Sequence, residues 1–253
     1  MENASRSIAA ALGPLRSQPG SAGIFLDFDG TMADIAPSPG DAELLPGFAA
    51  LLDELCTSYA VVAILSGRPS LEIRRLLPAR RIEVIGHYGA IGAPAASSSI
   101  RRVFEEVTAI ADAVPGAWVE DKGSTLAVHY RDAADRSEAE RLLSPRLREV
   151  GDRNALGLLR GKMVLELIPH GAPGKGGALL REVLAHDLSA CLCAGDDLAD
   201  LDAFRAVERL REGRVYGVRV AVRSEETPEE LCREADIIVD GPAGLLALLQ
   251  SLR

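Results

Sequence analysis

Three short runs of apolar residues, each followed at once by polar residues, constrain this chain more than any other feature. They are GIFLD at 23–27, YAVVAILSGR at 59–68 and ACLCAGDD at 190–197. Apolar runs without polar alternation are typical of central parallel strands that are buried on both faces. We therefore expect three buried strands whose carboxyl ends carry polar side chains.

Helical patterns separate these strands and indicate how they connect. GFAALLDELCTSY precedes the second run and GGALLREVLAHDL precedes the third. Alternating strands and helices imply right-handed crossovers, and so an α/β fold with a doubly wound, Rossmann-like parallel sheet. Further strands of this sheet are expected at 81–90, 215–222 and 235–240. Ligands bind outside the carboxyl ends of such strands, so Asp27, Ser66 and Asp196 are expected in one crevice.

The middle of the chain differs in pattern. The small residues of APAASSS at 93–99 predict a linker, and HGAPGKGG at 170–177 predicts a second one. Between them, apolar residues at helical spacing predict an amphipathic helix over 100–114. Another helix is predicted over 137–150, broken or bent at Pro145.

Two pairs of strands complete this middle region. One pair is predicted around Lys122 and Gly123, and the other around Gly161 and Lys162. We therefore predict a smaller α/β domain at 96–170, inserted into a core domain that is formed by 1–95 and 171–253.

Composition narrows the classes of function. The chain has 253 residues and a formal net charge of −9, which disfavours a nucleic-acid binder because clustered Lys and Arg supply most of that affinity. No run approaches the roughly 20 apolar residues of a membrane span, and the apolar stretch at 8–12 is too short for a secretory signal. The four cysteines form no C-x-x-C pair and are expected in the core. We expect a soluble cytoplasmic protein without a membrane partner, for which a monomer is plausible.

The acids that end the first strand suit phosphoryl transfer. A lone Asp-x-Asp is usually a solvated turn, but here three strand ends and a GKGG helix start supply acids, a hydroxyl and a lysine together. A carboxylate can attack a phosphate monoester only where cations neutralise the repulsion and hold the groups in line. We assign Asp27 as the nucleophile that forms an aspartyl-phosphate, and Asp29 as general acid and base. Gly30 permits a tight turn, and Thr31 offers a hydroxyl and an N–H to phosphate.

The other strand ends supply candidate phosphate and metal ligands. Ser66 and Lys175 offer donors to the phosphate, and Lys175 also stands at a helix start, where backbone N–H groups favour anions. Gly67 and Arg68, which follow Ser66, are assigned to the same phosphate. Oxygen ligands without a His or Cys cluster favour Mg²⁺. Its predicted ligands are Asp27, Asp29 (through its backbone carbonyl), Asp196 and Asp197, with Asp200 supporting them. For Asp200, helix capping or support of the other ligands is expected equally with direct ligation of the metal.

A nucleotide-binding P-loop is disfavoured. That motif requires G-x-x-x-x-G-K-[ST]. Here two residues separate Gly171 from Gly174, and Gly176 follows the lysine where Ser or Thr is needed. A nucleoside-triphosphate kinase is therefore not expected.

Four motifs in this order, DFDGT, SGR, GKGGAL and GDDLADLDAF, resemble those of haloacid dehalogenase-like hydrolases of the phosphatase kind. The middle motifs VEDKGSTLAVHYR and GKMVLELIP are similar to those of trehalose-6-phosphate phosphatases. The resemblance implies a cap domain whose sugar-binding residues are Glu120, Lys122, Lys162 and Glu166. An exposed strand face with cross-strand charge pairs is the alternative for these four.

The chain departs from that family's pattern at three positions. Ala199 and Leu201 stand where Thr and Glu are common, and Tyr88 stands where the G-x-H-G pattern has His. These departures bear on sugar preference more than on the phosphatase chemistry.

The leading hypothesis is a Mg²⁺-dependent phosphatase that converts trehalose 6-phosphate to trehalose and inorganic phosphate. Another sugar phosphate, such as sucrose phosphate or a glycosylated glycerate phosphate, is the related alternative. A sugar-phosphate-binding regulator without turnover and a phosphomutase are less favoured, because Asp27, Asp29 and Asp196 are all present and no second phosphate site is evident.

Overall fold

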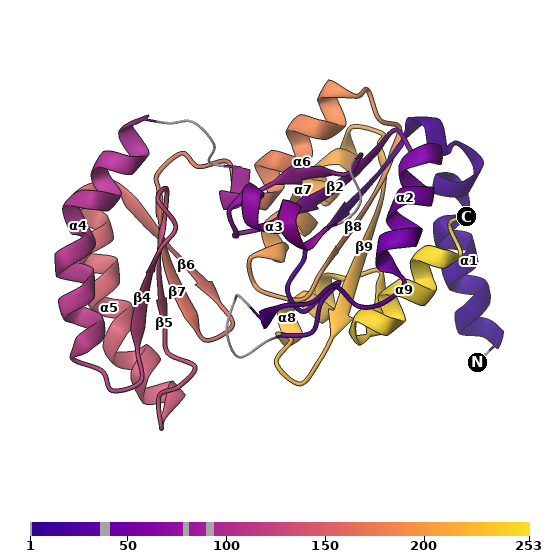
Figure 1. The fold of residues 1–253 in the computed structure, drawn as a ribbon. Coiled ribbons are helices and arrows are strands. Elements are labelled where there is room, and N and C mark those ends of the chain that lie inside the picture. The colour runs from indigo at the N-terminus through magenta and orange to yellow at the C-terminus, as the bar shows by residue number, and fades with distance from the viewer. Residues whose placement is uncertain (1, 36–40, 78–80, 90–93) are drawn as a thin grey trace. The chain divides into compact units, whose positions relative to one another are not determined.

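The chain forms two compact units (Figure 1). A computed structural model describes residues 2–35, 41–77, 81–89 and 94–253. The core unit comprises Met1–Gly89 and Gly174–Arg253, and the cap unit comprises Ala90–Pro173. The predicted cap, 96–170, falls within the second unit.

A six-stranded sheet forms the centre of the core unit, and all its described strand pairs are parallel. Its order is β10-β9-β8-β1-β2-β3. The strands are β1 (Ala22–Leu26), β2 (Val61–Leu65), β3 (Glu83–Ile85), β8 (Ala190–Gly195), β9 (Tyr216–Arg223) and β10 (Ile237–Asp240). The three runs that were predicted as central strands are therefore β1, β2 and β8, which are neighbours. The prediction of a doubly wound α/β fold is confirmed.

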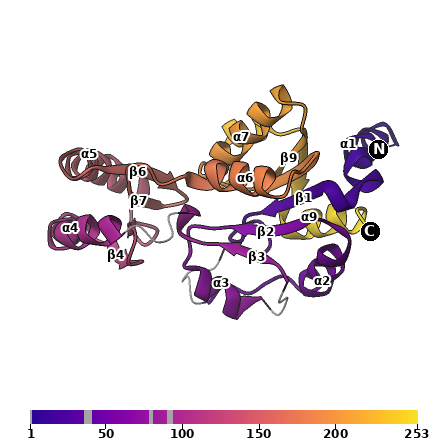
Figure 2. The same cartoon turned by 90° about the horizontal axis from the view of Figure 1, so that it is seen from above.

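Helices cover both faces of this sheet (Figure 2). One face packs against α1 (Glu2–Ser17), α2 (Phe48–Ser58), α3 (Ser70–Leu76) and α9 (Gly241–Gln250). The other packs against α6 (Gly174–Ala185), α7 (Asp200–Glu212) and α8 (Glu229–Glu234). Side chains alternate along a strand, so Ile24 and Leu26 enter the first layer while Phe25 enters the second. Both layers fix the position of the residue that follows β1.

The cap unit is an antiparallel sheet with two helices on one face. Its order is β4-β5-β7-β6. The elements are α4 (Pro94–Asp112), β4 (Trp118–Asp121), β5 (Leu126–His129), α5 (Arg136–Asn154), β6 (Leu156–Gly161) and β7 (Val164–Pro169). Apolar residues of both helices and of the sheet form one core. The four predicted strands are thus present.

Several expectations for the middle of the chain were wrong. Ala93 lies outside the described residues, but 94–99 form the start of α4 instead of a linker, since proline fits the first turn of a helix. Helix α5 runs unbroken through Pro145, because buried Leu143 and Leu147 on either side pack into the cap core. In the second predicted linker, α6 already begins at Gly174.

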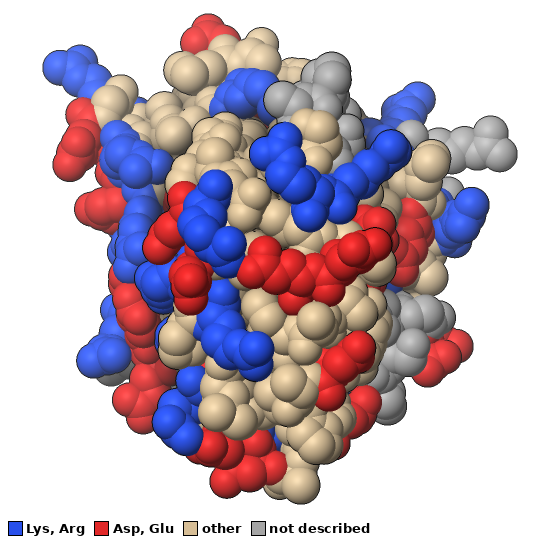
Figure 3. Space-filling model, turned by 90° about the vertical axis from the view of Figure 1, so that its left-hand side faces the viewer, with Lys and Arg blue, Asp and Glu red and all other residues tan. Residues whose placement is uncertain are grey.

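The outer faces of α4 and α5 carry charges of both signs. Figure 3 shows blue and red side chains interspersed over this side of the cap unit. Arg153 pairs with Glu106 across the two helices at 2.7 Å, and Arg141 pairs with Glu138 within α5 at 2.6 Å. These are the solvated faces of two amphipathic helices.

Two further expectations concern cysteines and membrane spans. All four cysteines lie in the described part of the chain and are free, with Cys191 and Cys193 buried in β8. Burial raises the pKa of the Cys191 thiol to about 12, as suits an inert core residue. Among the described residues, no helix is both long and apolar enough to cross a membrane.

Candidate active site

Asp27 lies at the carboxyl edge of the sheet, directly after β1. Its backbone N–H donates to the carbonyl of Ala194 (2.9 Å), which continues the pairing of β1 with β8 by one residue. Its carboxylate is buried and accepts a hydrogen bond from Lys175 Nζ at 2.7 Å. The two central strands therefore hold the backbone of Asp27, and α6 supplies the cation beside it.

Three carboxylates converge at this edge. Oxygens of Asp27, Asp196 and Asp200 lie within 4.8 Å of one another, and all three residues are buried. Lys175 Nζ also donates to Asp200 Oδ1 at 2.7 Å. We call these four residues the core cluster. Its donor set of carboxylate oxygens fits Mg²⁺, which prefers hard oxygen ligands.

Burial dominates the electrostatics of the core cluster. It raises the pKa of the Asp27 carboxyl well above its usual value. Lys175 opposes this rise, while the charges of Asp200, Asp196 and Asp29 add to it. Burial alone would lower the pKa of Lys175, but its pairs with Asp200 and Asp27 raise it above the ordinary value. The lysine therefore stays charged, and a further cation at the cluster would favour the ionised form of Asp27.

Asp200 holds the loop that carries Asp196. Its Oδ2 accepts the backbone N–H groups of Asp196 (3.0 Å) and Asp197 (3.1 Å), so it caps this loop and does not cap α7. Asp197 was predicted as a metal ligand, but the cluster found in the described chain contains Asp200 in its place. The Asp197 carboxylate accepts the N–H of Leu198 at 2.6 Å.

Gly30 and Thr31 form the turn that faces Asp196. Gly30 has φ +77°, and a Cβ built there would lie 1.9 Å from Asp196 Oδ2. Only glycine fits at this position without displacing that carboxylate. The Thr31 hydroxyl donates to Asp196 Oδ1 at 3.2 Å.

Ser66 and Gly67 follow β2, the neighbour of β1. Ser66 is buried, and its backbone N–H donates to the carbonyl of Ile85 (3.0 Å). A Cβ on Gly67 would lie 2.4 Å from the hydroxyl of Tyr88, so a side chain there would displace the end of the tyrosine ring. Tyr88, one of the departures from the family pattern, has φ +52° and donates its N–H to the Ser66 carbonyl at 3.0 Å. Tyr88 therefore supports the Ser66 loop.

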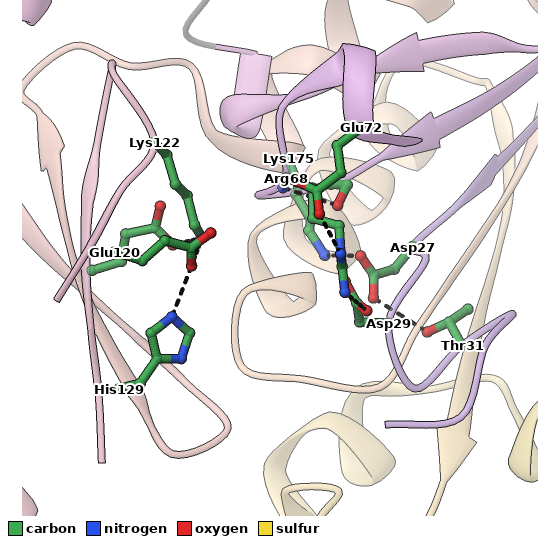
Figure 4. Close-up of polar contacts among 11 residues, drawn as sticks. Asp27, Asp29, Thr31, Arg68, Glu72, Glu120, Lys122, His129 and Lys175 are labelled. Carbon is green, nitrogen blue, oxygen red and sulfur yellow. Dashed lines mark hydrogen bonds and ion pairs between the residues drawn. The ribbon is translucent and has the colours of Figure 1, made fainter. Parts of the chain in front are cut away.

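Arg68 binds carboxylates on both sides of its guanidinium (Figure 4). It contacts Asp29 through Nε (2.6 Å) and Nη2 (2.7 Å), and Glu72 through Nη1 (2.8 Å). The SGR motif predicted phosphate as the partner of Arg68, and no role was predicted for Glu72. The spacing of four residues between Arg68 and Glu72 was the one available signal.

The start of α6 is occupied by an acid. The N–H of Gly176 donates to Asp202 Oδ2 at 2.8 Å, so an anion does meet a backbone N–H at this helix start, and it is a carboxylate of α7. A Cβ on Gly174 or Gly176 would lie 2.3 or 2.4 Å from atoms of Asp202. The glycines of GKGG thus admit close packing of α6 against α7.

In the cap unit, three of the predicted sugar-binding residues meet on the face of the sheet opposite α4 and α5. Lys122 Nζ lies 3.2 Å from Glu166 and 4.0 Å from Glu120. Figure 4 labels Lys122 and Glu120. We call Glu120, Lys122 and Glu166 the cap cluster. The fourth predicted residue, Lys162, lies in the turn between β6 and β7.

Two residues that sequence analysis did not assign hold the cap cluster. The Thr125 hydroxyl donates to Glu166 Oε1 at 2.6 Å, and His129 Nε2 lies 2.8 Å from Glu120 Oε2. Trp118 stacks on the His129 ring with centroids 4.1 Å apart. The register of β4 and β5 places His129 directly opposite Trp118. Side chains along a strand alternate between its two faces, and this alternation was the sequence signal that could have placed the two rings together.

Ala199 and Leu201, two of the departures from the family pattern, lie in the interior of the core unit. Both residues are buried, and Leu201 packs in the apolar layer with Phe204. Leucine at this position therefore adds to the core of the unit.

Comparisons with known proteins agree with this geometry. A trehalose-phosphatase family model matches residues 25–234. A trehalose-phosphate phosphatase of Mycobacterium leprae is 35% identical over 80% of this chain and 51% of its own length. An uncharacterized glycosyl hydrolase of Mycobacterium tuberculosis is 36% identical over 80% of this chain and 16% of its own length. The chain thus spans about half or less of these two relatives.

A solved structure has the same fold throughout. The C-terminal domain of the C. albicans trehalose-6-phosphate phosphatase superposes with a TM-score of 0.82 at 22% identity, over 97% of this chain and 96% of that one. The family match covers most of the chain, including every residue of the core cluster and the cap cluster. The chain belongs to the trehalose-phosphatase family.

Proposed function

We propose that this protein hydrolyses trehalose 6-phosphate to trehalose and inorganic phosphate. The observation that carries the proposal is the core cluster, in which a buried aspartate at the end of β1 lies 2.7 Å from a buried lysine and beside two further carboxylates. The family match and the relatives named trehalose-phosphate phosphatases support the choice of substrate.

In the first half of the reaction, an Asp27 oxygen attacks phosphorus and forms an aspartyl-phosphate. The bond from phosphorus to the sugar oxygen breaks, and Asp29 gives that oxygen a proton. In the second half, Asp29 takes a proton from water, whose oxygen attacks phosphorus and releases Asp27. Lys175 keeps one cation beside the nucleophile throughout, which reduces its repulsion from phosphate.

Residues at the same edge would hold Mg²⁺. We propose the carboxylates of Asp27 and Asp196 and the backbone carbonyl of Asp29 as its ligands. When bound, the ion supplies positive charge that stabilises the phosphate oxygens in the transition state. Asp200, whose oxygens are engaged by Lys175 and by two backbone N–H groups, fixes the Asp196 loop for this purpose.

The cap cluster is proposed to bind the sugar. Its ammonium and carboxylate groups can donate to and accept from several hydroxyls. Lys162 is proposed to take part as well. The four free cysteines support a reducing, cytoplasmic setting for the enzyme.

The test is a panel of sugar phosphates that is assayed for phosphate release with and without Mg²⁺. We expect trehalose 6-phosphate to have the highest kcat/KM and the reaction to require Mg²⁺. A higher value for sucrose phosphate or a glycosylated glycerate phosphate would overturn the substrate. Binding of trehalose 6-phosphate without release of phosphate would overturn the enzyme function and favour a regulatory protein.

A further inference from the structure

The side chain of Arg68 makes a two-point contact with Asp29. Nε and Nη2 of the guanidinium donate to the two different carboxylate oxygens, at 2.6 and 2.7 Å. The Arg68 side chain is 10% exposed and the Asp29 side chain is 39% exposed. A planar fork that holds both oxygens fixes the rotation of the carboxylate as well as its position.

Arg68 is itself fixed from several directions. Its Nη1 donates to Glu72 on the first turns of α3 at 2.8 Å, and its backbone N–H donates to Ser66 Oγ at 3.1 Å. Its carbonyl accepts the N–H of His87 at 3.1 Å, and its guanidinium lies 5.8 Å from the centre of the Phe28 ring. The fork thus reaches Asp29 from a rigid base.

These contacts argue against phosphate as the partner of Arg68. Three donors of its guanidinium already serve the carboxylates of Asp29 and Glu72. A phosphate would compete with these part-buried, charge-assisted hydrogen bonds for the guanidinium, whereas Lys175 already lies beside the nucleophile.

We propose that Arg68 is a positioning residue that orients the Asp29 carboxylate toward the leaving oxygen, and that Glu72 orients Arg68. The inference rests on the proposed function, because the proton transfer by Asp29 belongs to it. A catalytic group that is displaced by about 1 Å can lose on the order of 100-fold in rate, so the orientation has a measurable effect.

The experiment compares Arg68→Lys with the wild type on two substrates. Lysine keeps the charge but cannot hold both oxygens of Asp29. The first substrate is trehalose 6-phosphate, whose alkoxide leaving group needs a proton. The second is p-nitrophenyl phosphate, whose phenolate leaves without one. Arg74→Lys, on the same helix as Glu72, is the matched control, because Arg74 contacts the carbonyl of Ile82.

We expect kcat/KM of Arg68→Lys on trehalose 6-phosphate to fall by about tenfold or more, and kcat/KM on p-nitrophenyl phosphate by less than about threefold, because kcat/KM covers only the steps up to the aspartyl-phosphate, before Asp29 acts on water. Glu72→Gln should change the ratio of the two kcat/KM values in the same direction, but by a smaller factor than Arg68→Lys does. In an Asp29→Asn background, Arg68→Lys should not change the ratio further. Equal losses on both substrates, or a ratio that stays at the wild-type value, would overturn the proposal.

Two readouts need no turnover of trehalose 6-phosphate. The affinity for inorganic phosphate with Mg²⁺, measured by calorimetry, should stay within about twofold in Arg68→Lys; a loss of about tenfold or more would assign Arg68 to phosphate. Crystal structures should show the Asp29 carboxylate rotated in Arg68→Lys and unchanged in Arg74→Lys. An unchanged Asp29 in Arg68→Lys contradicts positioning. Wild-type protein that releases no phosphate from any sugar phosphate contradicts the proposed function alone, and these two readouts still decide the role of Arg68.

Discussion

The core cluster and the cap cluster contain the same kinds of charged groups, but the chain builds them differently. The core cluster joins loops after β1 and β8 to the start of α6, and Lys175 lies 148 positions from Asp27. The cap cluster lies on one sheet face, where the register places Glu120 and Glu166 on either side of Ala127. The proposed reaction needs groups that are buried and fixed, whereas the proposed binding of a sugar can use a strand face.

The two clusters also differ in how their charges are compensated. Lys175 is 4% exposed and faces carboxylates that are 8% and 2% exposed. In the cap cluster, Lys122 is 11% exposed, and Glu120, at 25%, still meets water. Thr125 and His129 contact the two cap glutamates in addition to Lys122. The core cluster therefore depends on its lysine more than the cap cluster does.

The largest effect is expected from Asp27, the proposed nucleophile. Asp27→Asn should lower kcat for every phosphate monoester by more than about 10³-fold, because an amide cannot attack phosphorus. Its melting temperature should stay equal or rise, since one of three crowded carboxylates is removed. Asp34→Asn, at an exposed position of the same loop, is the control and should keep its activity. More than a tenth of wild-type activity in Asp27→Asn would remove Asp27 from the role.

The next largest effect is expected on the free energy of unfolding, where the variants of Lys175 and Lys122 should differ. Lys175→Met leaves buried carboxylates without their cation and should lower the free energy of unfolding by about 3–5 kcal/mol. Lys122→Met should cost about 1–2 kcal/mol, because Thr125 and His129 remain. Urea titrations followed by circular dichroism measure both variants, and the fluorescence of Trp118, the single tryptophan, reports the cap unit. Equal costs would show that the clusters are compensated alike.

A third comparison of the two units uses two glycines with similar φ angles, Gly30 in the core unit and Gly123 in the cap unit. Gly30 has φ +77° and Gly123 has φ +80°. A Cβ on Gly123 meets nothing within 4 Å, so Gly123→Ala should cost only the backbone strain of roughly 1–2 kcal/mol. Gly30→Ala adds the clash with Asp196 and should cost more, with loss of Mg²⁺-dependent activity. Similar melting temperatures and activities of the two variants would contradict the close approach of the Gly30 turn to Asp196.

The smallest effect is expected from the cap cluster and should depend on the substrate. Lys122→Met should raise KM for trehalose 6-phosphate by about tenfold, since a charged hydrogen bond to the sugar is lost. Its kcat/KM for p-nitrophenyl phosphate, which has no sugar, should not change. Steady-state kinetics on both substrates measure this. A loss on p-nitrophenyl phosphate of the same size would mean that Lys122 does not act through the sugar.

The sequence was most informative where a period or a strand end fixed the geometry. Apolar runs predicted β1, β2 and β8, and neighbouring parallel strands end at one edge of a sheet, so Asp27 and Asp196 were expected together. The predicted roles of these residues stay predictions until the variants are measured.

Side-chain contacts between distant segments could not be predicted from the sequence. The pair of Arg68 with Asp29 spans 39 positions, and the bond from Gly176 to Asp202 spans 26. Each depends on rotamers and helix packing that no local pattern encodes. The small residues at 94–99 led to the wrong prediction of a linker, because a linker and a helix that starts at a proline can have the same composition.

The most direct test of the account is to find the phosphoryl group on the protein. Asp29→Asn, which should slow hydrolysis of the intermediate, is mixed with Mg²⁺ and p-nitrophenyl phosphate, whose leaving group needs no proton from Asp29, then quenched in acid and examined by fragment mass spectrometry. We expect phosphate on Asp27. Phosphate on Ser66, or phosphate release with no phosphorylated residue at any time, would contradict a mechanism that begins with attack by Asp27.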